Sequence, residues 1–206
     1  MNKSFSISES IKFGWQTFKL NIGFFIKLAL IVIAINIILG STNNISKDNW
    51  FIAFIINIAA ALVHFLVDMG LIRIGLNFYD KKKSQLSDVF GPIHLLLKYF
   101  LASFIQGLII LLGFILLIVP GIIFAIRLHF TSYLIIEKGL GPIEAIKTSW
   151  EMTKGKTINL LLFFLATIGL NLLGLLALVV GLAVTIPVTM LATAYVYKKL
   201  ESNKVA

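Results

Sequence analysis

Apart from Lys27, which lies early in the first apolar stretch and can extend to the membrane interface, five ionisable side chains lie well inside the long apolar stretches of this chain. They are His64, Asp68, Arg73, Arg127 and His129. An ionisable side chain at the centre of a membrane-spanning helix costs about 2.5–3.5 kcal/mol on insertion scales. If the apolar stretches cross a membrane, each of these residues needs a partner, a route to the interface or a function. We therefore treat the five as a candidate intramembrane polar site.

Their spacing leaves two interpretations open. His64 and Asp68 are four residues apart and share one helix face. An Asp68–Arg127 pair between two helices would neutralise both charges, which makes the set a buried structural clamp. Alternatively, the set forms a path for protons, ions or lipid headgroups. Arg127 can also extend to the membrane interface on its own.

The chain shows no pattern of a metal centre or a catalytic site. It has no cysteine, and its three histidines are scattered without a second carboxylate nearby, which makes a poor metal site. None of the motifs GxxxxGK[ST], GxGxxG, HExxH and GxSxG is present. We therefore expect a protein that is not an enzyme and that uses no metal and no cofactor.

The elements that must position these residues are those of an integral membrane protein. Of the 206 residues, 59% are hydrophobic and 13% are charged, which is about half the charged share of an average soluble domain. No charged residue occurs from Tyr99 to Ile126 or from Thr157 to Tyr197. A bilayer span needs about 20 apolar residues, so the second of these runs has to fold back once.

Six apolar segments predict six membrane-spanning helices, at residues 20–40, 51–78, 97–117, 119–137, 157–174 and 176–197. The connections alternate between nearly uncharged and basic, and 14 of the 18 lysine and arginine residues fall at the termini and in the basic connections. The positive-inside rule then places both termini in the cytoplasm, with the protein in a bacterial inner membrane. The net charge of +9 reflects this topology and an attraction to anionic lipids rather than binding of nucleic acid.

The chain also repeats itself. Ile11-Lys12-x-x-Trp15 matches Ile146-Lys147-x-x-Trp150, and Leu86–Phe90 is a looser third copy. We predict one polytopic domain over residues 1–206 that contains three hairpin repeats, at about residues 5–80, 86–138 and 142–200. Chance similarity between apolar segments is the alternative.

The ends of the hairpins match as well. Arg73 precedes Tyr79 by six residues, and Arg127 precedes Tyr133 by six. Tyr195 occupies the same place in the third hairpin, with Thr189 in the arginine position. This alignment predicts that Arg73 and Arg127 are equivalent positions of the repeat.

The polar segment that precedes each hairpin is predicted to be an amphipathic helix at the cytoplasmic membrane surface. In the first segment, Ser6 to Glu9 fit a capping box, and an apolar stripe contains Ile7, Ile11, Trp15 and Phe18. In the third, Pro142 suits the first helical turn. Either these segments are anchors and spacers, or they recognise lipids or partners directly. Their lipid-facing residues are predicted to be Trp15, Phe90, Trp150, Lys12, Lys147 and Lys154.

The last predicted span carries a ribbon of small residues that lets helices approach closely. Its members recur every fourth position, at Ala177, Gly181, Thr185, Thr189 and Thr193. Pro187 is expected to kink this helix. The ribbon serves packing within the bundle or, alternatively, contact with a second copy of the chain.

Residues 116–156 resemble a known group of bacterial membrane proteins. The group comprises the membrane domain found ahead of some glycerophosphoryl diester phosphodiesterases and the related YciC-like small membrane proteins. The matching elements in this stretch are Pro120-Gly121, Arg127, Tyr133, Glu137 before Gly139, Pro142-x-Glu144-Ala145, Ser149-Trp150 and Thr153-Lys154-Gly155. Outside it, Trp15 and Ala194-Tyr195-x-Tyr197-Lys198 also fit, so the likeness spreads over most of the chain. The resemblance implies a six-span helical unit without an established biochemical role. It supplies no catalytic residue, because the catalytic phosphodiesterase domain is not expected in this chain.

The sequence therefore predicts an all-α integral membrane protein that binds anionic lipids on the cytoplasmic side or partner membrane proteins, in envelope homeostasis. A homo-oligomer is a further expectation. One alternative is a small transporter or channel that uses the intramembrane His/Asp/Arg set. Another is an immunity protein against a membrane-active peptide.

Overall fold

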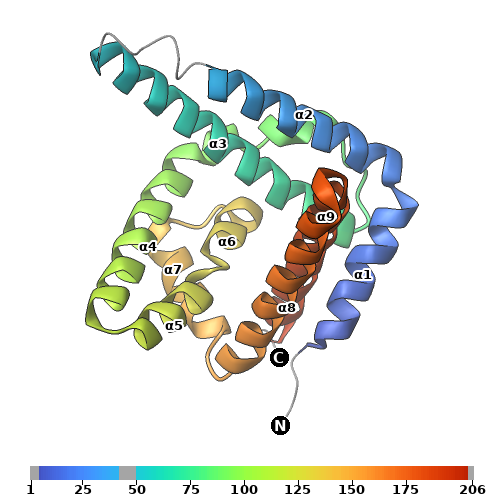
Figure 1. The fold of residues 1–206 in the computed structure, drawn as a ribbon. Coiled ribbons are helices and arrows are strands. Elements are labelled where there is room, and N and C mark those ends of the chain that lie inside the picture. Colours follow the sequence, from blue (N-terminus) through green and yellow to red (C-terminus); the bar gives the residue numbers. More distant parts are fainter. Residues whose placement is uncertain (1–4, 42–49, 204–206) are drawn as a thin grey trace.

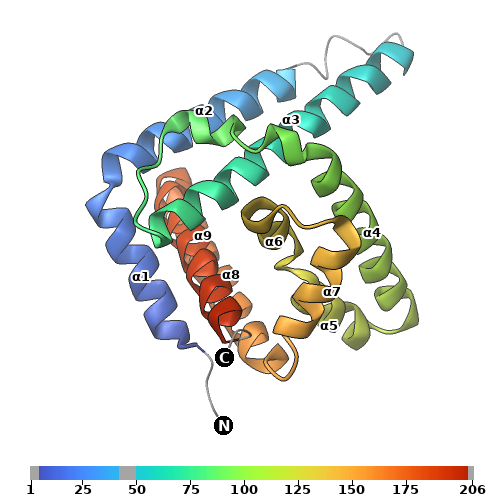
Figure 2. The same ribbon diagram turned by 180° about the vertical axis from the view of Figure 1, so that it is seen from behind.

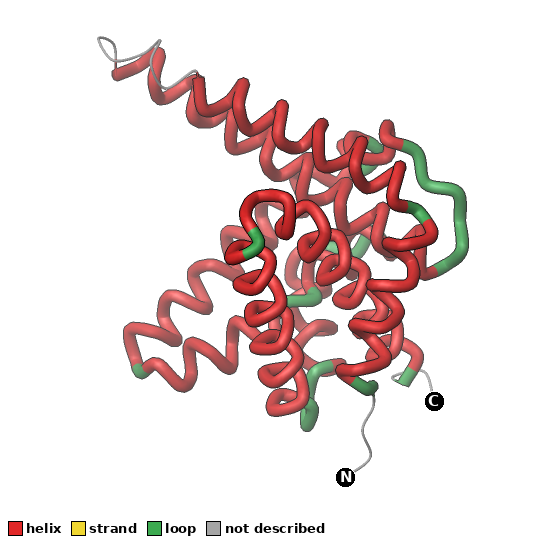
Figure 3. Tube along the Cα trace, turned by 45° about the vertical axis from the view of Figure 1, so that its right-hand side comes forward, coloured by secondary structure: helices red, strands yellow, loops and turns green. Residues whose placement is uncertain are grey.

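The computed structural model of the protein describes residues 5–41 and 50–203, and within these ranges it contains helices and loops but no strand (Figures 1 and 3). The two short 3-10 helices are η2 (Leu86–Phe90) and η3 (Ile93–Leu95). The longer helices are α1 (Ile7–Leu20), α2 (Ile22–Ser41), α3 (Trp50–Tyr79), α4 (Leu96–Leu116), α5 (Ile118–Leu128), α6 (Thr131–Lys138), α7 (Pro142–Met152), α8 (Thr157–Leu176) and α9 (Leu178–Ser202).

Five segments of the described chain are long and apolar enough to cross a membrane, which supports the expectation of a helical membrane protein. They are α2, α3, the run from η2 through α4, the run formed by α5 and α6, and α8. The predicted spans agree with these segments to within a few residues, apart from the start of the third. The sixth predicted span falls on α9, which contains several threonines and Pro187 and is not one of the five. A sixth span therefore stays a prediction.

The fourth predicted span is interrupted in the structure, because α5 ends at Leu128 and α6 begins at Thr131. The backbone carbonyl of Arg127 explains the break. It accepts hydrogen bonds from Ser149 Oγ at 2.8 Å and from Thr153 Oγ1 at 3.2 Å. Both hydroxyls come from the end of α7, so they satisfy a carbonyl that a continuous helix would bond to the backbone N–H four residues later.

Helix α1 begins where its sequence predicts, since Ser6 Oγ accepts from the backbone N–H of Glu9 at 3.4 Å. Its contact face differs from the predicted stripe. The buried residues of α1 are Ser10, Gly14 and Phe18, whereas Trp15 is 45% exposed. Small residues determine this face, because a Cβ at Gly14 would lie 2.3 Å from the backbone oxygen of Val188. The helix therefore packs backbone to backbone on α9.

The three predicted repeat segments pack in a cyclic order (Figures 1 and 2). Helix α1, ahead of the first hairpin, packs on α9 of the third hairpin. Segment η2, ahead of the second hairpin, packs on α3 of the first, and α7, ahead of the third, packs on α5 and α6 of the second. Each segment thus lies against the last helix of the hairpin before it. Three repeats would produce this order, although the repeat itself remains a prediction.

The outer parts of α2 and α3 extend away from the rest of the molecule (Figures 1 and 3). The body behind them holds two clusters of buried residues. One cluster lies chiefly between α6, α8 and α9, with Phe130 and Tyr197 at its centre. The other joins α1, α2, α3 and α9 around Phe25. Polar side chains gather at the ends of α3, α6 and α9, and these ends position the candidate site.

Candidate functional site: two polar hollows beside Lys82

Arg127 does not pair with Asp68. No ion pair joins these two residues, both of which lie in the described part of the chain. The guanidinium instead donates from Nη2 to the backbone oxygen of Trp150 at 2.7 Å and lies 3.4 Å from the centre of the Trp150 ring. Arg127 therefore holds α7 against α5 through a hydrogen bond and a cation–π contact. The predicted Asp68–Arg127 clamp is therefore wrong, because Arg127 contacts the backbone and the indole of Trp150 instead of a carboxylate.

His129 lies among aromatic rings in the break between α5 and α6. Its ring is 4.5 Å from Phe164 and 5.3 Å from Phe130, both in edge-to-face contact. Tyr133 follows at 6.3 Å. These rings make His129 part of the core packing between α6 and α8.

His64 and Asp68 are exposed on α3, at the depth of a predicted span. Asn57, about two to three helical turns away on the same helix, is exposed as well. Arg73 lies nearer the end of α3 and lines a polar hollow. The structure thus divides the predicted five-residue set among three places: His64 with Asp68, Arg73, and Arg127 with His129.

A cluster of charges joins the ends of α3, α6 and α9. Lys198 Nζ donates to Glu137 Oε1 and lies 2.9 Å from Asp80 Oδ1. Tyr197 donates from its hydroxyl to Glu137 Oε2 at 2.6 Å. We call Asp80, Glu137, Tyr197 and Lys198 the charge clasp. It joins the ends of α3, α6 and α9, because Lys198 bridges Asp80 and Glu137.

The clasp shifts the pKa values of Asp80 and Lys198 in opposite directions. Burial acts to raise the pKa of Asp80, but hydrogen bonds and charge from Lys198 and Lys82 outweigh it, so that pKa lies below its ordinary value. Burial acts to lower the pKa of Lys198, but Glu137 and Asp80 outweigh it, so that pKa lies above its ordinary value. Both groups are therefore charged in the folded protein across neutral pH.

A polar hollow of about 460 Å³ opens beside the clasp. We call it the arginine hollow. It lies between the end of α3, η3 and the end of α6, and its lining residues are Arg73, Leu76, Asn77, Asp80, Lys82, His94, Leu95, Ile136, Glu137, Lys138 and Gly139. Its two carboxylates both belong to the clasp, and Lys138 pairs with Glu201 at 2.6 Å.

A second hollow of about 600 Å³ lies on the other side of Lys82. We call it the lysine hollow, because three consecutive lysines line it together with aromatic rings. Its lining residues are Phe13, Thr17, Leu20, Asn21, Phe24, Phe78, Lys81, Lys82, Lys83, Ser84 and Gln85. Ser84 Oγ is buried and has no hydrogen-bond partner. The hollow combines cationic and apolar walls at the junction of α1, α2 and α3.

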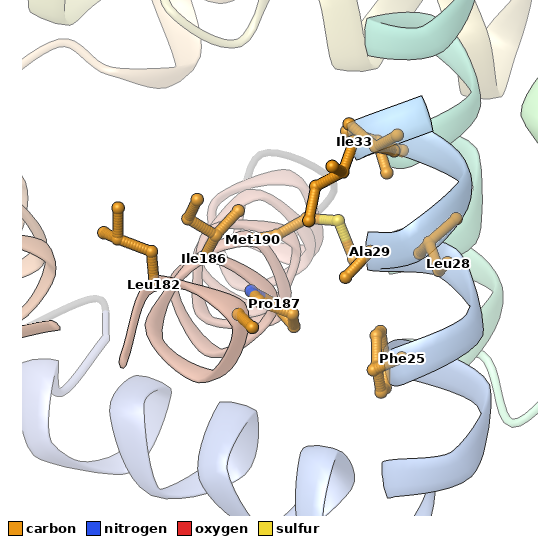
Figure 4. A pocket seen from close by; sticks show the side chains of 11 residues that line it. Phe25, Leu28, Ala29, Ile33, Leu182, Ile186, Pro187 and Met190 are labelled. Carbon is orange, nitrogen blue, oxygen red and sulfur yellow. The ribbon is translucent and has the colours of Figure 1, made fainter. Parts of the chain in front are cut away.

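An apolar pocket of about 230 Å³ lies between α2 and α9, and Pro187 is one of its lining residues (Figure 4). Figure 4 shows Phe25, Ala29 and Ile33 of α2 on one side and Ile186 and Met190 of α9 on the other. The pocket and the lysine hollow are neighbours, because the adjacent residues Phe24 and Phe25 line the hollow and the pocket, respectively. Both rings pack on Phe78, at 5.3 and 5.1 Å.

The residues predicted to face lipid are divided in a similar way. Lys12, Lys147 and Lys154 are exposed, as are Trp15 and Phe90 at 45% and 47%. Trp150 is half-buried, because Arg127 covers one part of its ring and Phe124 packs 5.6 Å from it. In the structure Trp150 is a packing residue of α7.

Sequence reasoning did not find the two hollows or the clasp. Lys81, Lys82 and Lys83 were visible only as part of the positive-inside pattern, and Glu137 and Tyr197 only as elements of the resemblance. The clasp joins residues 80, 137 and 198, and no spacing in the sequence connects them. One local pattern could have indicated the lysine hollow, namely the three lysines that closely follow Phe78 and Tyr79 at the end of an apolar run.

The fold and the site define a helical membrane protein with a basic, hollowed face. Residues 102–204, half of the chain, match the model of the DUF975 family, described as a protein of unknown function. The chain belongs to this family. The match supports the expectation of an uncharacterised family, while the likeness to the membrane domain of phosphodiesterases stays a prediction.

Mycobacterial relatives cover almost the whole chain. The uncharacterised protein Rv2560 of Mycobacterium tuberculosis is 23% identical over 236 residues, which cover 99% of this chain and 71% of that protein. The uncharacterised protein Mb2590 of Mycobacterium bovis is 23% identical over 232 residues, with the same coverage. No solved structure matches.

Proposed function

We propose that this protein is a non-enzymatic membrane protein that binds anionic lipids on the side that carries its termini. The observation that carries the proposal is the lysine hollow. Three lysines meet the phenylalanine rings of α1, α2 and α3 there. An anionic lipid has a charged end and an apolar end, and the hollow presents a matching wall to each.

Electrostatics favours an anionic over a zwitterionic headgroup at this site. Lys82 forms one ion pair, with Asp80 at 3.3 Å, and its side chain is 66% exposed. Lys81 and Lys83 form no ion pair with the described residues. Each basic residue near an anionic membrane surface contributes roughly 1 kcal/mol of attraction. Lys81 and Lys83 are thus a local source of positive charge that the described residues do not neutralise, while Lys82 shares its charge with Asp80.

The apolar pocket between α2 and α9 extends the same idea toward the bilayer. Its walls are almost entirely apolar (Figure 4), and it starts beside Phe25, next to the lysine hollow. We infer that an acyl chain of the bound lipid lies there. Burial of each methylene group contributes about 0.8 kcal/mol, so the chain adds affinity and the lysines add headgroup preference.

The proposal assumes six spans in three hairpins, with both termini and the basic connections in the cytoplasm of a bacterial inner membrane. The close packing of the start of α1 and the end of α9 is consistent with it, since Tyr195 donates to Glu9 at 3.5 Å. The chain has no native cysteine, so single cysteines report topology cleanly. Cysteines placed at Leu117 and Ser87 should react with an impermeant reagent from opposite sides of the membrane, and reaction from one side would contradict this orientation.

The direct test is titration of the detergent-solubilised protein with short-chain phosphatidylglycerol and with phosphatidylcholine. We expect phosphatidylglycerol to bind more tightly. Replacing Lys81, Lys82 and Lys83 together by glutamine should weaken phosphatidylglycerol binding by about tenfold or more, given roughly 1 kcal/mol for each lysine. Phosphatidylcholine binding should change far less.

The matched control removes the same charge elsewhere. Lys12, Lys147 and Lys154 are exposed lysines of α1, α7 and the segment after α7. The sequence pattern predicted that they face lipid, so this variant also compares the amphipathic surface with the hollow. Their joint replacement by glutamine should leave the lipid preference within about threefold of the unchanged protein. Equal losses in both triple variants would mean that overall charge, and not the hollow, attracts the lipid.

Transport is the second candidate function, and one observation favours it. His64 and Asp68 are exposed at the depth of a predicted span, where an uncompensated carboxylate is costly. A water-filled path or a partner helix would remove that cost. Proton or ion flux into proteoliposomes that is lost on Asp68→Asn would support transport, and flux that is indifferent to this change would exclude Asp68 from a path.

A further inference from the structure

Arg73 and Arg127 occupy equivalent positions of the predicted repeat, yet the structure uses them differently. Arg127 donates to the backbone of Trp150 and stacks on its ring. Arg73 is half-buried and has neither an ion pair nor a hydrogen bond to any described residue. Its Nε lies 3.6 Å from where a Cβ on Gly91 would stand, and its side chain lines the arginine hollow. One arginine is a structural tie, and the other has unused donors that face a cavity.

The acidic groups around the arginine hollow are all engaged elsewhere. Lys198 bridges Asp80 and Glu137, and Lys138 pairs with Glu201. Asp88, close to Gly91, accepts from the backbone N–H of Gln85 at 2.9 Å and from Asn77 Nδ2 at 3.4 Å. The guanidinium of Arg73 therefore has no carboxylate partner, because the two carboxylates that line the hollow already pair with Lys198.

The remaining walls of the hollow offer further hydrogen-bond donors. His94 lines it and is exposed, and Lys138 lines it with a side chain that is 39% exposed. An arginine guanidinium matches the oxygen geometry of a phosphoryl group and can donate two parallel hydrogen bonds to it. A cavity of about 460 Å³ has room for a phosphoryl group together with the atoms that it esterifies.

We propose that the arginine hollow is a second ligand site, which binds the phosphoryl group of a phosphate ester through Arg73, with His94 and Lys138 as additional donors. The ligand source is either a lipid headgroup or a free phosphate compound, because both present the same oxygens. This site is distinct from the lysine hollow and goes beyond the proposed function. Only Lys82 lines both, and the proposal does not depend on it.

The experiment measures binding of two probes to the full-length protein in detergent, namely inorganic phosphate and short-chain phosphatidylglycerol. Arg73→Gln should weaken binding of at least one probe by tenfold or more. Arg73→Lys should recover part of the loss, because it restores the charge but not the paired donors. The Lys81, Lys82 and Lys83 triple variant tests the lysine hollow separately, and phosphate binding at the arginine hollow should survive it within about threefold.

Arg127→Lys is the matched control, since it alters the equivalent arginine. It should lower the thermal unfolding midpoint, through loss of the tie to Trp150, without changing the affinity of the folded protein for either probe. Loss of phosphatidylglycerol binding alone in Arg73→Gln would identify a headgroup site, and loss of phosphate binding alone a small-anion site. Unchanged binding of both probes in folded Arg73→Gln, or an equal loss in Arg127→Lys, would overturn the proposal.

Discussion

At the scale of single residues, hydrogen bonds to charged groups connect helices that are remote in the sequence. Arg127 ties α5 to α7 through the Trp150 backbone, and Lys198 ties α9 to both Glu137 and Asp80. The side chains of Lys198, Glu137 and Asp80 are 13%, 19% and 26% exposed, so they are screened less than surface pairs. Hydrogen bonds to charged groups contribute about 1.5–3 kcal/mol each, whereas an exposed pair contributes close to nothing.

The pH dependence of stability tests the clasp. The pKa of Asp80 is lowered on folding, so its contribution is complete above the ordinary value of about 3.9 and is lost as the pH falls through the folded value. The pKa of Lys198 is raised on folding, so its contribution is complete below about 10.4 and is lost as the pH rises through the folded value. The unfolding midpoint in detergent should therefore be flat between these limits and fall outside them.

Removal of the lysine should change this profile in a specific way. Lys198→Met should lower the midpoint at pH 7 by roughly 5 °C or more, from the loss of two charged hydrogen bonds. Without Lys198, the burial of the charged Asp80 carboxylate is no longer offset by that cation. Protonation of Asp80 then removes the free-energy cost of burying its charge, so the unfolding midpoint of this variant should rise or stay level as the pH falls from 7 to 4. Lys154→Met, an exposed lysine, is the control. A Lys198→Met profile parallel to that of the control would show that the clasp contributes nothing.

At the scale of the elements, small residues allow helices to approach closely where the sequence predicted an apolar stripe. A Cβ on Gly14 would lie 2.3 Å from the oxygen of Val188, and a Cβ on Gly70 would lie 2.1 Å from the oxygen of Val89. These two glycines seat α1 on α9 and η2 on α3. A small residue at the contact lets two backbones meet, which is the common mode of helix association in membranes.

Gly14→Ala should therefore destabilise the protein, because the added methyl group would clash with the backbone oxygen of Val188. A backbone atom cannot move away by changing rotamer, as a side chain can. Overpacking of this kind costs about 1–3 kcal/mol, which should lower the unfolding midpoint by several degrees. Gly23→Ala is the matched control, since a Cβ there meets nothing within 4 Å. That change should leave the midpoint unchanged or raise it, because alanine is a better helix former than glycine by roughly 0.5–1 kcal/mol. Equal destabilisation by both changes would contradict the close packing of α1 on α9.

The sequence predicted the elements well and their contacts poorly, for physical reasons. Long apolar runs identify α2, α3, α4 and α8, because the length of a span is set by the bilayer. The break after Leu128 was missed, because it depends on hydroxyls of Ser149 and Thr153 that reach the carbonyl of Arg127. A local pattern cannot reveal such a bond between distant segments.

The site shows the same division. Sequence patterns singled out Arg73 and Arg127 as charges in apolar surroundings. In the structure Arg127 contacts Trp150, and Arg73 lines the arginine hollow. The Asp68–Arg127 pair was wrong, because the charge of a guanidinium can be met by a ring face and a carbonyl as well as by a carboxylate. The lysine hollow was missed, because its walls come from α1, α2 and α3 and meet only in the folded chain.

At the scale of the whole molecule, the cyclic packing of α1, η2 and α7 ties the first hairpin to the last. Helix α1 lies on α9, so the chain closes on itself, and the basic ends of the helices form one hollowed region. The lysine hollow lies where α1 meets α2 and α3, and the arginine hollow lies where α3 meets α6. A lipid held there would touch elements of more than one hairpin.

Native mass spectrometry of the protein released gently from its own membrane tests the central claim most directly. We expect a discrete anionic lipid to stay with the unchanged protein and with the Lys12, Lys147 and Lys154 triple variant. The same lipid should be lost when Lys81, Lys82 and Lys83 are replaced by glutamine. A bare protein, or a lipid retained equally by both triple variants, would contradict lipid binding at the lysine hollow.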